Sequence, residues 1–256
     1  WQPKLKKYAE SKRLICFSTP FDPTAVDFLE KLKMPLYKVA SFEIADIPLL
    51  EKIGETKKPV IMSCGMGIAT EEEIKFGIQT LKKHGCPSVA LLYCVSSYPA
   101  DYSEMHLTTI PDMTKKFKTV VGISDHSPGI VVSVASVALG ASIIEKHLTL
   151  RRTDGGPDAE FSLEPNEFRE LVDSVRKTEV TIGKPSYQAG LSENIIFRKS
   201  LFVIEDIKKE EKFTSKNIRS IRPGYGLAPK YLKQALNKKA KQNLKRGTPL
   251  KLSHLS

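Results

Sequence analysis

The chain of 256 residues lacks any run long and apolar enough to cross a bilayer. Its longest largely apolar stretch, residues 130–144, is interrupted by three serines and Gly140, and a spanning helix needs about 20 apolar residues. No charged segment followed by an apolar one opens the chain, so we expect a cytoplasmic protein without a membrane partner. The first residue is Trp1 rather than Met, so we expect the natural protein to extend further in the N-terminal direction.

The chain is also poor in cysteine, and its four cysteines form no Cys-x-x-Cys pair. The spacing therefore predicts neither a zinc module nor a disulfide framework. Three of the four lie in or beside apolar runs, where a free cysteine behaves as a small core residue. We expect reduced thiols, as is usual in the cytosol. The four positions are Cys16, Cys64, Cys86 and Cys94.

Acidic residues are scarce in the last part of the chain. Residues 199–256 contain 15 Lys and Arg but only four Asp and Glu, whereas residues 1–198 carry 25 of each sign. The whole net charge of +11 thus belongs to the tail. Such a tail either presents a solvated lysine surface or attracts an anion: nucleic acid, an acidic partner or a phosphorylated substrate. The tail has few aromatic side chains, which argues against a nucleic-acid partner because bases stack on aromatic side chains.

In the first two-thirds of the chain, apolar runs alternate with amphipathic helical patterns. This alternation predicts parallel β/α architecture with strands covered on both faces. The runs begin about 22 to 31 residues apart, the length of one βα unit. Predicted strands cover 14–18, 37–40, 60–63, 89–94, 120–123 and 142–146, and predicted helices include 24–32, 70–84, 129–139 and 164–182.

Polar residues capable of chemistry follow all six predicted strands. A doubly wound sheet gathers its ligand at one switch point, whereas in a TIM barrel every strand end faces one mouth. The pattern therefore favours a TIM-type (β/α)8 barrel that lacks its first two βα units. We assign residues 1–182 to this partial barrel, 183–197 to a linker and 198–256 to a small β-rich domain near the lower size limit for independent stability.

Two histidines occupy equivalent places after adjacent strands. His126 and His147 lie 21 residues apart, one βα unit. Both imidazoles could therefore bind one divalent ion, with water and substrate oxygens completing its coordination. The alternative is a pair of hydrogen-bonded polar residues at the barrel rim.

Lys38 lies inside an apolar strand and must point into the barrel, where an unpaired charge is costly. It is either a Schiff-base nucleophile or a counter-ion to a phosphate or carboxylate. Small hydroxyls near the same mouth favour the second reading. They belong to Ser41, Ser63, Ser96 and Ser97.

Asp158 ends a glycine-rich loop and either holds a sugar hydroxyl or belongs to a simple turn.

Taken together, these segments resemble the NeuB family of sialic acid synthases. The matching segments are Phe-Ser-Thr-Pro-Phe-Asp (17–22), Tyr-Lys-Val-Ala-Ser-Phe-Glu (37–43), Ser-Ser-Tyr-Pro (96–99), Ser-Asp-His (124–126), Glu-Lys-His (145–147), Gly-Pro-Asp (156–158) and Phe-Ser-Leu-Glu-Pro (161–165). The tail, with Ser-Ile-Arg-Pro-Gly-Tyr-Gly-Leu (220–227), is similar to the antifreeze-like (SAF) domain of these enzymes. Within the family, the residues of these segments are most similar to those of the pseudaminic acid synthase branch.

The resemblance implies a reaction and a set of roles. Members condense phosphoenolpyruvate with the open-chain aldehyde of an N-acetylated amino sugar, release phosphate and use Mn²⁺ or Mg²⁺. It implies pseudaminic acid synthesis, with N-acetylneuraminate or legionaminate as alternative products. Carried onto this chain, it makes His126 and His147 the metal ligands and Glu43 the catalytic residue, also directed at the sugar. The implied phosphoenolpyruvate ligands are Thr19, Lys38, Ser41, Ser63 and Ser124 with Ser96 or Ser97, and the other implied sugar ligands are Tyr98, Asp158 and, across a domain-swapped homodimer, Arg222.

The chain also departs from the family pattern. The first two strands of the family bring a glutamate and a lysine to the site, and this chain begins after both. We therefore expect the fragment alone to be inactive. A protein that binds sugar without catalysis is the alternative from another class, but retention of both histidines, Lys38 and Glu43 argues against it. A Schiff-base aldolase built on Lys38 is the other enzymatic alternative.

Overall fold

The computed structural model describes residues 1–66, 69–187 and 192–256. The chain divides into two units, Trp1–Gly183 and Lys184–Ser256, which are described separately below. Within the described ranges, no helix has the length and apolarity that a membrane crossing requires.

The first unit is built on a five-stranded parallel sheet in which each strand pairs with its neighbour in the sequence. The strands are β1 (Tyr37–Val39), β2 (Val60–Met66), β3 (Val89–Val95), β4 (Val121–Asp125) and β5 (Ile144–Lys146). The sheet curls into half of a barrel, and within the described residues β5 and β1 are its two edge strands. The prediction of a parallel α/β fold is therefore confirmed.

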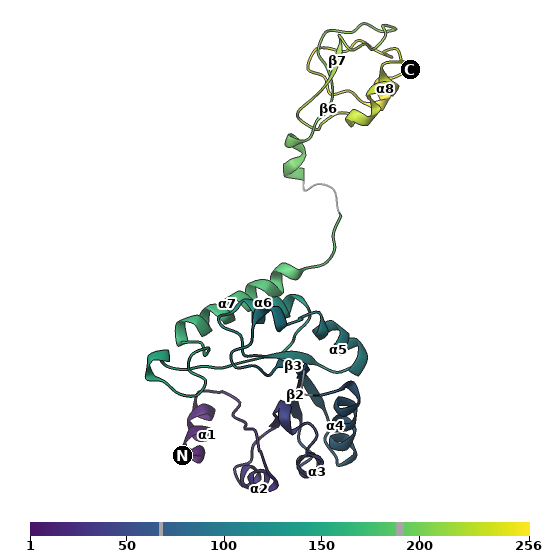
Figure 1. Cartoon of the computed structure of the whole chain (residues 1–256). Coiled ribbons are helices and arrows are strands. Elements are labelled where there is room, and N and C mark those ends of the chain that lie inside the picture. The colour runs from purple at the N-terminus through teal and green to yellow at the C-terminus, as the bar shows by residue number, and fades with distance from the viewer. Residues whose placement is uncertain (67–68, 188–191) are drawn as a thin grey trace. The chain divides into compact units, whose positions relative to one another are not determined.

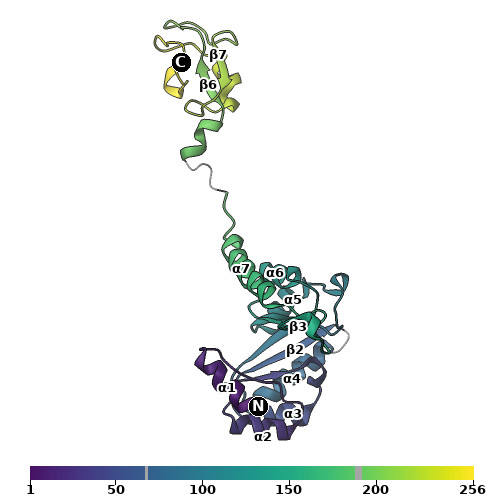
Figure 2. The ribbon, with the colours of Figure 1, turned by 90° about the vertical axis from the view of Figure 1, so that its left-hand side faces the viewer.

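Helices cover the outer face of this sheet. They are α2 (Pro23–Lys31), α3 (Ile47–Glu55), α4 (Glu71–Lys83), α5 (Thr109–Phe117), α6 (Val131–Ala138) and α7 (Pro165–Ile182), whereas α1 (Gln2–Ser11) has no buried residue. In Figure 1 they follow one another around the strands from α2 to α7, and the ring is open on the side of α1. Figure 2, turned by 90°, shows α3 and α4 on one side of β2 and β3 and α5 and α6 on the other.

Local sequence signals set where several helices begin. Asp22 accepts a hydrogen bond from the Ala25 amide at the start of α2, with Pro23 at the first helical position. At the start of α4, Thr70 and Glu73 form a reciprocal capping box. Each cap satisfies amides that the first helical turn leaves without partners.

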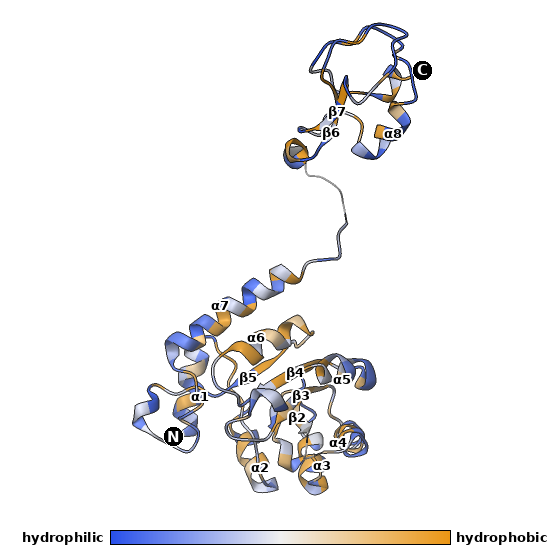
Figure 3. Ribbon diagram, turned by 45° about the horizontal axis from the view of Figure 1, so that its top comes forward, coloured by the Kyte–Doolittle hydropathy of each residue, from blue (hydrophilic) through white to orange (hydrophobic). Residues whose placement is uncertain are grey.

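Strand alternation separates a mostly apolar outer row from an inner face that carries polar groups at the carboxyl ends of the strands. Side chains on successive residues of a strand point to opposite faces of the sheet. The outer row packs under the helices and includes Val39, Met62, Leu91, Tyr93 and Ile123, none more than 1% exposed. In Figure 3 much of β2 and β3 has apolar colour, while α4, α5 and α7 carry both apolar and polar colour. The polar residues described below lie on the inner face.

One predicted strand is wrong. Of residues 14–18, only Ser18 joins the sheet, through an isolated bridge to Tyr37 in which the Lys38 amide donates to the Ser18 carbonyl at 3.2 Å. Leu14 and Ile15 are 64% and 73% exposed. A strand at this position would have a neighbour on one side only, so its apolar side chains gain little burial from joining the edge. The other five predicted strands are confirmed, with shifted ends.

The second unit is small and β-rich with its own core. Its strands β6 (Ser200–Val203) and β7 (Ile218–Ile221) pair antiparallel. Short helical segments accompany them: η4 (Ser192–Phe197), η5 (Pro229–Tyr231), α8 (Leu232–Ala235) and η6 (Leu252–His254). Leu201, Val203, Phe213 and Leu250 are at most 1% exposed and centre the core. The prediction of a small β-rich fold for this segment is confirmed.

Candidate active site at the carboxyl ends of the strands

Lys38 lies on the inner face of β1 and is 6% exposed. Its Nζ donates to Ser63 Oγ on β2 at 2.7 Å and to the Val39 carbonyl at 3.1 Å. The same Nζ lies 3.5 Å from Glu145 Oε1 on β5. A buried ammonium group is tolerated when a carboxylate and hydrogen-bond acceptors surround it. Lys38 thus joins three strands of the half-barrel at one point.

Glu145 extends this arrangement across the sheet. Its Oε1 accepts a hydrogen bond at 2.7 Å from Ser124 Oγ on β4, and Ser124 is 2% exposed. A polar row therefore runs from Ser63 through Lys38 and Glu145 to Ser124; we call these four residues the inner row. In the sequence, Glu145 stood out only as part of the Glu-Lys-His segment (145–147), without a role of its own. Its alternation in phase with His147 on the same strand was the available signal.

A second cluster of hydroxyls lies beside the inner row. Ser41, in the short helical turn η1 (Ser41–Glu43), is 4% exposed and its Oγ lies 3.0 Å from Ser96 Oγ. Ser97 instead donates to Glu104 Oε2 at 3.4 Å. Of the two serines that follow β3, the structure therefore brings Ser96 to Ser41. Thr19 is half-buried and follows Ser18, whose bridge to Tyr37 carries it to the β1 edge.

Glu43 also belongs to η1 and is half-buried. Its Oε2 is shielded from solvent and has no hydrogen-bond partner within the described residues. Buried carboxylate oxygens without a partner are rare in folded proteins. This oxygen is therefore available to accept a hydrogen bond from a ligand.

His126 is 5% exposed and is fixed in one orientation. Its Nδ1 lies 3.0 Å from the Val95 carbonyl oxygen, and its Nε2 lies 3.5 Å from Ser124 Oγ. Because a carbonyl only accepts, the proton is on Nδ1 and the lone pair is on Nε2. Burial lowers the pKa of His126, and the neighbouring His147 adds to this. The ring is therefore neutral at pH 7 and able to bind a metal ion through Nε2.

His147 faces His126 across β4 and β5, with 5.3 Å between ring centroids. Its Nδ1 lies 3.6 Å from Asp158 Oδ2. Two aromatic rings flank the pair. Tyr98 lies 4.3 Å from the His126 centroid, and Phe161 lies 5.1 Å from that of His147. Burial raises the pKa of the Tyr98 phenol, with Cys94 and Asp158 contributing, so the phenol remains a hydrogen-bond donor.

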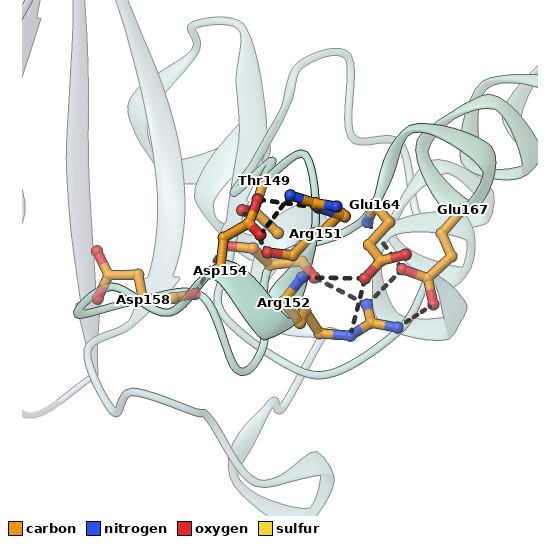
Figure 4. A network of polar contacts seen from close by, with 8 residues as sticks. Thr149, Arg151, Arg152, Asp154, Asp158, Glu164 and Glu167 are labelled. Carbon is orange, nitrogen blue, oxygen red and sulfur yellow. Dashed lines mark hydrogen bonds and ion pairs between the residues drawn. The ribbon is translucent and has the colours of Figure 1, made fainter.

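The loop between β5 and α7 carries Asp158, and Figure 4 shows how it is anchored. The Arg152 guanidinium binds both carboxylate oxygens of Glu167 and the Ser162 carbonyl, and the Arg152 amide donates to Glu164 Oε1 at 3.0 Å. The hydrogen bond from Arg152 lowers the pKa of Glu167 to about 2. Asp158 lies apart from this network in Figure 4. The anchored loop therefore leaves Asp158 free to face His147.

The residues present fit a divalent ion with two protein ligands. No group of three or more His, Cys, Asp or Glu side chains suited to a metal ion occurs in residues 1–66, 69–187 and 192–256. His126 and His147 supply two neighbouring imidazoles, one with its Nε2 lone pair free. Imidazole suits Mn²⁺ less than it suits zinc, so water and substrate oxygens would complete the shell of a harder ion.

Arg222 belongs to the second unit and is exposed. Its Nε donates to the Phe197 carbonyl at 2.7 Å, which holds the side chain against η4. The approach of Arg222 to a barrel therefore stays a prediction.

A half-barrel of parallel strands with a buried lysine, a row of hydroxyls and two histidines at its carboxyl ends has the arrangement of an α/β enzyme site. Comparison with known proteins gives the family. The NeuB family model matches residues 1–187 and the SAF domain model matches residues 198–256. The chain belongs to the NeuB family. The predictions of this family and of a nonulosonic acid synthase enzyme are thereby confirmed.

Named relatives support the same class. The chain is 39% identical to pseudaminic acid synthase of Campylobacter jejuni over 98% of this chain and 73% of that protein. It is 39% identical to N,N'-diacetyllegionaminic acid synthase of the same species, over 93% of this chain and 72% of that protein. The crystal structure of the N-acetylneuraminic acid synthetase of Leptospira borgpetersenii is 36% identical, with a TM-score of 0.70 over 75% of this chain and 67% of that one.

Proposed function

We propose that this chain forms the catalytic part of a synthase that condenses phosphoenolpyruvate with an acylated amino sugar to give pseudaminic acid and phosphate. The observation that carries the proposal is the inner row, which places the Lys38 ammonium and three acceptor or donor groups beside the histidine pair. The identity to pseudaminic acid synthases supports the choice of product. Legionaminic acid is the second candidate because a synthase of that acid is equally identical to this chain.

Phosphoenolpyruvate would bind along the inner row and the hydroxyls beside it. Lys38 supplies the positive charge for its phosphate or carboxylate, and hydroxyls of Ser41, Ser63, Ser96 and Ser124 supply hydrogen bonds, with Thr19 at the edge. Charge-assisted bonds of this kind orient an anion without covalent attachment. The contacts of Lys38 with Ser63 and Glu145 are those of an ammonium ion, so we propose counter-ion rather than Schiff-base chemistry.

The histidine pair would hold Mn²⁺ or Mg²⁺ through His126 and His147. When bound, such an ion polarises a carbonyl oxygen as a Lewis acid. The residues around it position the sugar: Tyr98 donates a hydrogen bond, Asp158 accepts from a sugar hydroxyl, and the free Glu43 oxygen accepts another. Glu43 is our candidate for the proton-transfer residue because its oxygen has no competing donor among the described residues. Phe161 forms an apolar wall.

We also propose that two further βα units close the barrel. The open edge at β5 is flanked by a cavity of about 250 Å³ lined by Ile144 on β5 and by apolar residues of α6 and α7. At the other edge, Leu14 and Ile15 are exposed. Both features suit an additional neighbouring strand with a covering helix. The relative from C. jejuni is longer, since this chain covers 73% of it.

The SAF unit completes the proposal. Its excess of positive charge suits a position over a site for anionic substrates. We propose a cytoplasmic, domain-swapped homodimer in which Arg222 of one copy reaches the acyl group of the sugar in the other. Arg222 suits this role because its guanidinium remains charged and can donate to an amide carbonyl.

Phosphate release tests the proposal. The longest form of the protein that its gene encodes is incubated with phosphoenolpyruvate, Mn²⁺ and, in turn, the acylated amino sugar precursors of pseudaminic, legionaminic and N-acetylneuraminic acid. We expect the release of phosphate and the formation of a keto acid with the precursor of pseudaminic acid. Turnover of another precursor alone would correct the product. Sugar binding without turnover of any of the three would instead support a binding protein, and trapping of Lys38 by borohydride with pyruvate would support an aldolase.

A further inference from the structure

Directly beneath the histidine pair, on the opposite face of the sheet, lies a buried ion pair. Asp125 ends β4 and Lys146 ends β5, and the two are register partners in the parallel pairing. Lys146 Nζ lies 2.9 Å from Asp125 Oδ2, with side chains 1% and 0% exposed. Each therefore immediately adjoins a histidine in the sequence: Asp125 precedes His126, and Lys146 precedes His147.

Four further groups, from Ser127 and Ser133, form hydrogen bonds with this pair. Asp125 Oδ1 accepts from the Ser127 amide at 2.9 Å and from Ser127 Oγ at 2.7 Å. Asp125 Oδ2 accepts from Ser133 Oγ on α6 at 2.5 Å, and Lys146 Nζ donates to the Ser127 carbonyl. Ser127 and Ser133 are completely buried. The network thus ties together the ends of β4 and β5, the turn after His126 and α6.

Stability alone does not account for such a pair. Removing two charges from water costs several kcal/mol per ion, and apolar side chains of similar volume are often as stabilising or more so. Directional hydrogen bonds contribute a defined geometry, because each bond restricts a distance and an angle in the network. Here the restricted backbone is the one that carries both imidazoles. Ser127 is held through its amide, its hydroxyl and its carbonyl, so the peptide that follows His126 has little freedom.

We propose that Asp125 and Lys146 are positioning residues that set the placement of His126 relative to His147 and thereby the affinity of the pair for a divalent cation. The inference rests on the proposed metal site. Neither residue reaches the inner face, since strand alternation directs both toward α6. Their effect on the cation is therefore transmitted through the backbone of the two strand ends.

The test measures Mn²⁺ affinity, from the electron paramagnetic resonance signal of free Mn²⁺, and thermal stability without metal. Three variants are compared with the unaltered protein in its longest encoded form: Asp125→Asn, Lys146→Met and the double variant Asp125→Val/Lys146→Met. The matched control is Ser136→Ala, which removes a buried hydroxyl of α6 that donates to the Ser133 carbonyl outside the ion pair. We expect the double variant to stay folded and all three variants to bind Mn²⁺ about 10- to 100-fold more weakly, the usual cost of losing a partner behind a metal ligand. The control keeps the original affinity.

Each other outcome overturns the inference, and the outcomes are distinguishable. If the unaltered protein binds Mn²⁺ and the folded double variant binds it equally well, the pair does not position the histidines, while the metal site stands. If the double variant fails to fold, the pair serves the fold rather than the site. If the unaltered protein binds no Mn²⁺, the metal site of the proposed function fails, and the inference fails with it.

Discussion

Ser124 and Glu145 face each other across β4 and β5, with the serine hydroxyl donating to the carboxylate at 2.7 Å. The same carboxylate oxygen lies 3.5 Å from Lys38 Nζ. One glutamate thus balances the only lysine on the inner face of the described strands and orients a hydroxyl beside His126. This arrangement makes Glu145 the residue on which the charge of the inner row depends.

Replacing Glu145 by Gln should therefore damage activity more than stability. The amide keeps a hydrogen bond from Ser124 but leaves Lys38 without its carboxylate. Because the Glu145 side chain is 40% exposed, we expect the free energy of unfolding to fall by no more than about 1 kcal/mol. We expect kcat/KM for phosphoenolpyruvate to fall by at least about 100-fold, the cost of a misplaced charged group in an active site. Steady-state kinetics and urea unfolding measure the two effects.

The control for Glu145→Gln is Glu170→Gln, which changes an exposed glutamate on α7. It should alter neither quantity. Equal kinetics for Glu145→Gln and the unaltered protein would show that the inner row tolerates an uncompensated Lys38.

Removing either histidine should abolish tight Mn²⁺ binding. His126→Ala and His147→Ala each take away one of two imidazole ligands, and we expect the dissociation constant to rise by at least about 100-fold. Isothermal titration with Mn²⁺ measures it. His84→Ala serves as the control because His84 ends α4 and bonds the Thr80 carbonyl, away from the strand ends. Unchanged affinity in both site variants would place the metal elsewhere.

Arg152→Ala should release the loop that carries Asp158. The change removes the contacts to Glu167 and to the Ser162 carbonyl. We expect KM for the sugar to rise by about 10-fold, since small misplacements of binding groups carry costs of this size or larger, while KM for phosphoenolpyruvate stays constant. Arg176→Ala, which breaks an exposed pair with Glu179 on α7, is the control. A parallel rise in both KM values would mean that the loop supports the whole site.

The same anchor has a predictable pH dependence. Because the pKa of Glu167 is lowered to about 2 from its ordinary value of 4.5, its contribution to stability is complete above pH 4.5 and is lost as the pH falls through about 2. Glu167→Gln should therefore reduce the free energy of unfolding at pH 7 by a small amount, because the pair is partly exposed. The difference from the unaltered protein should vanish near pH 2. A constant difference across this range would contradict the assignment.

Subunit mixing tests the proposed role of Arg222. Glu43→Ala and Arg222→Ala should each be nearly inactive with the sugar. If Arg222 acts on the partner copy, a hybrid dimer contains one site with both defects and one with neither, and mixed samples should regain activity. Hybrids that demonstrably form without regaining activity would mean that Arg222 serves its own barrel or no site.

The sequence predicted the fold because buried parallel strands leave a plain pattern: apolar runs one βα unit apart, each followed by polar residues. It also predicted that Lys38 points inward, since an unpaired lysine beneath the covering helices would be costly. It failed at 14–18, where β propensity was present but a second neighbouring strand was not. Propensity describes a residue, whereas strand formation also depends on the pairing and burial that its neighbours in the fold provide.

Contacts between residues that are distant in the sequence could not be predicted. Nothing local to Glu145 indicates that its carboxylate meets Ser124 and Lys38, because that contact depends on the register of β4 with β5 and on the curl of the sheet. The same holds for Asp125 and Lys146, which read as ordinary members of two short motifs. Likewise, Ser96 and Ser97 are indistinguishable in sequence, and only the turn after β3 directs Ser96 to Ser41.

In the proposed reaction, we infer that phosphoenolpyruvate reacts through its methylene carbon beside the inner row, so that phosphate leaves by breakage of its C–O bond. The direct measurement is the reaction in ¹⁸O-labelled water, analysed by mass spectrometry of both products. Water attacks the carbon that bore the phosphate, so the account predicts label in the new keto acid and none in the released phosphate. Label in the phosphate would mean P–O cleavage and would contradict the account.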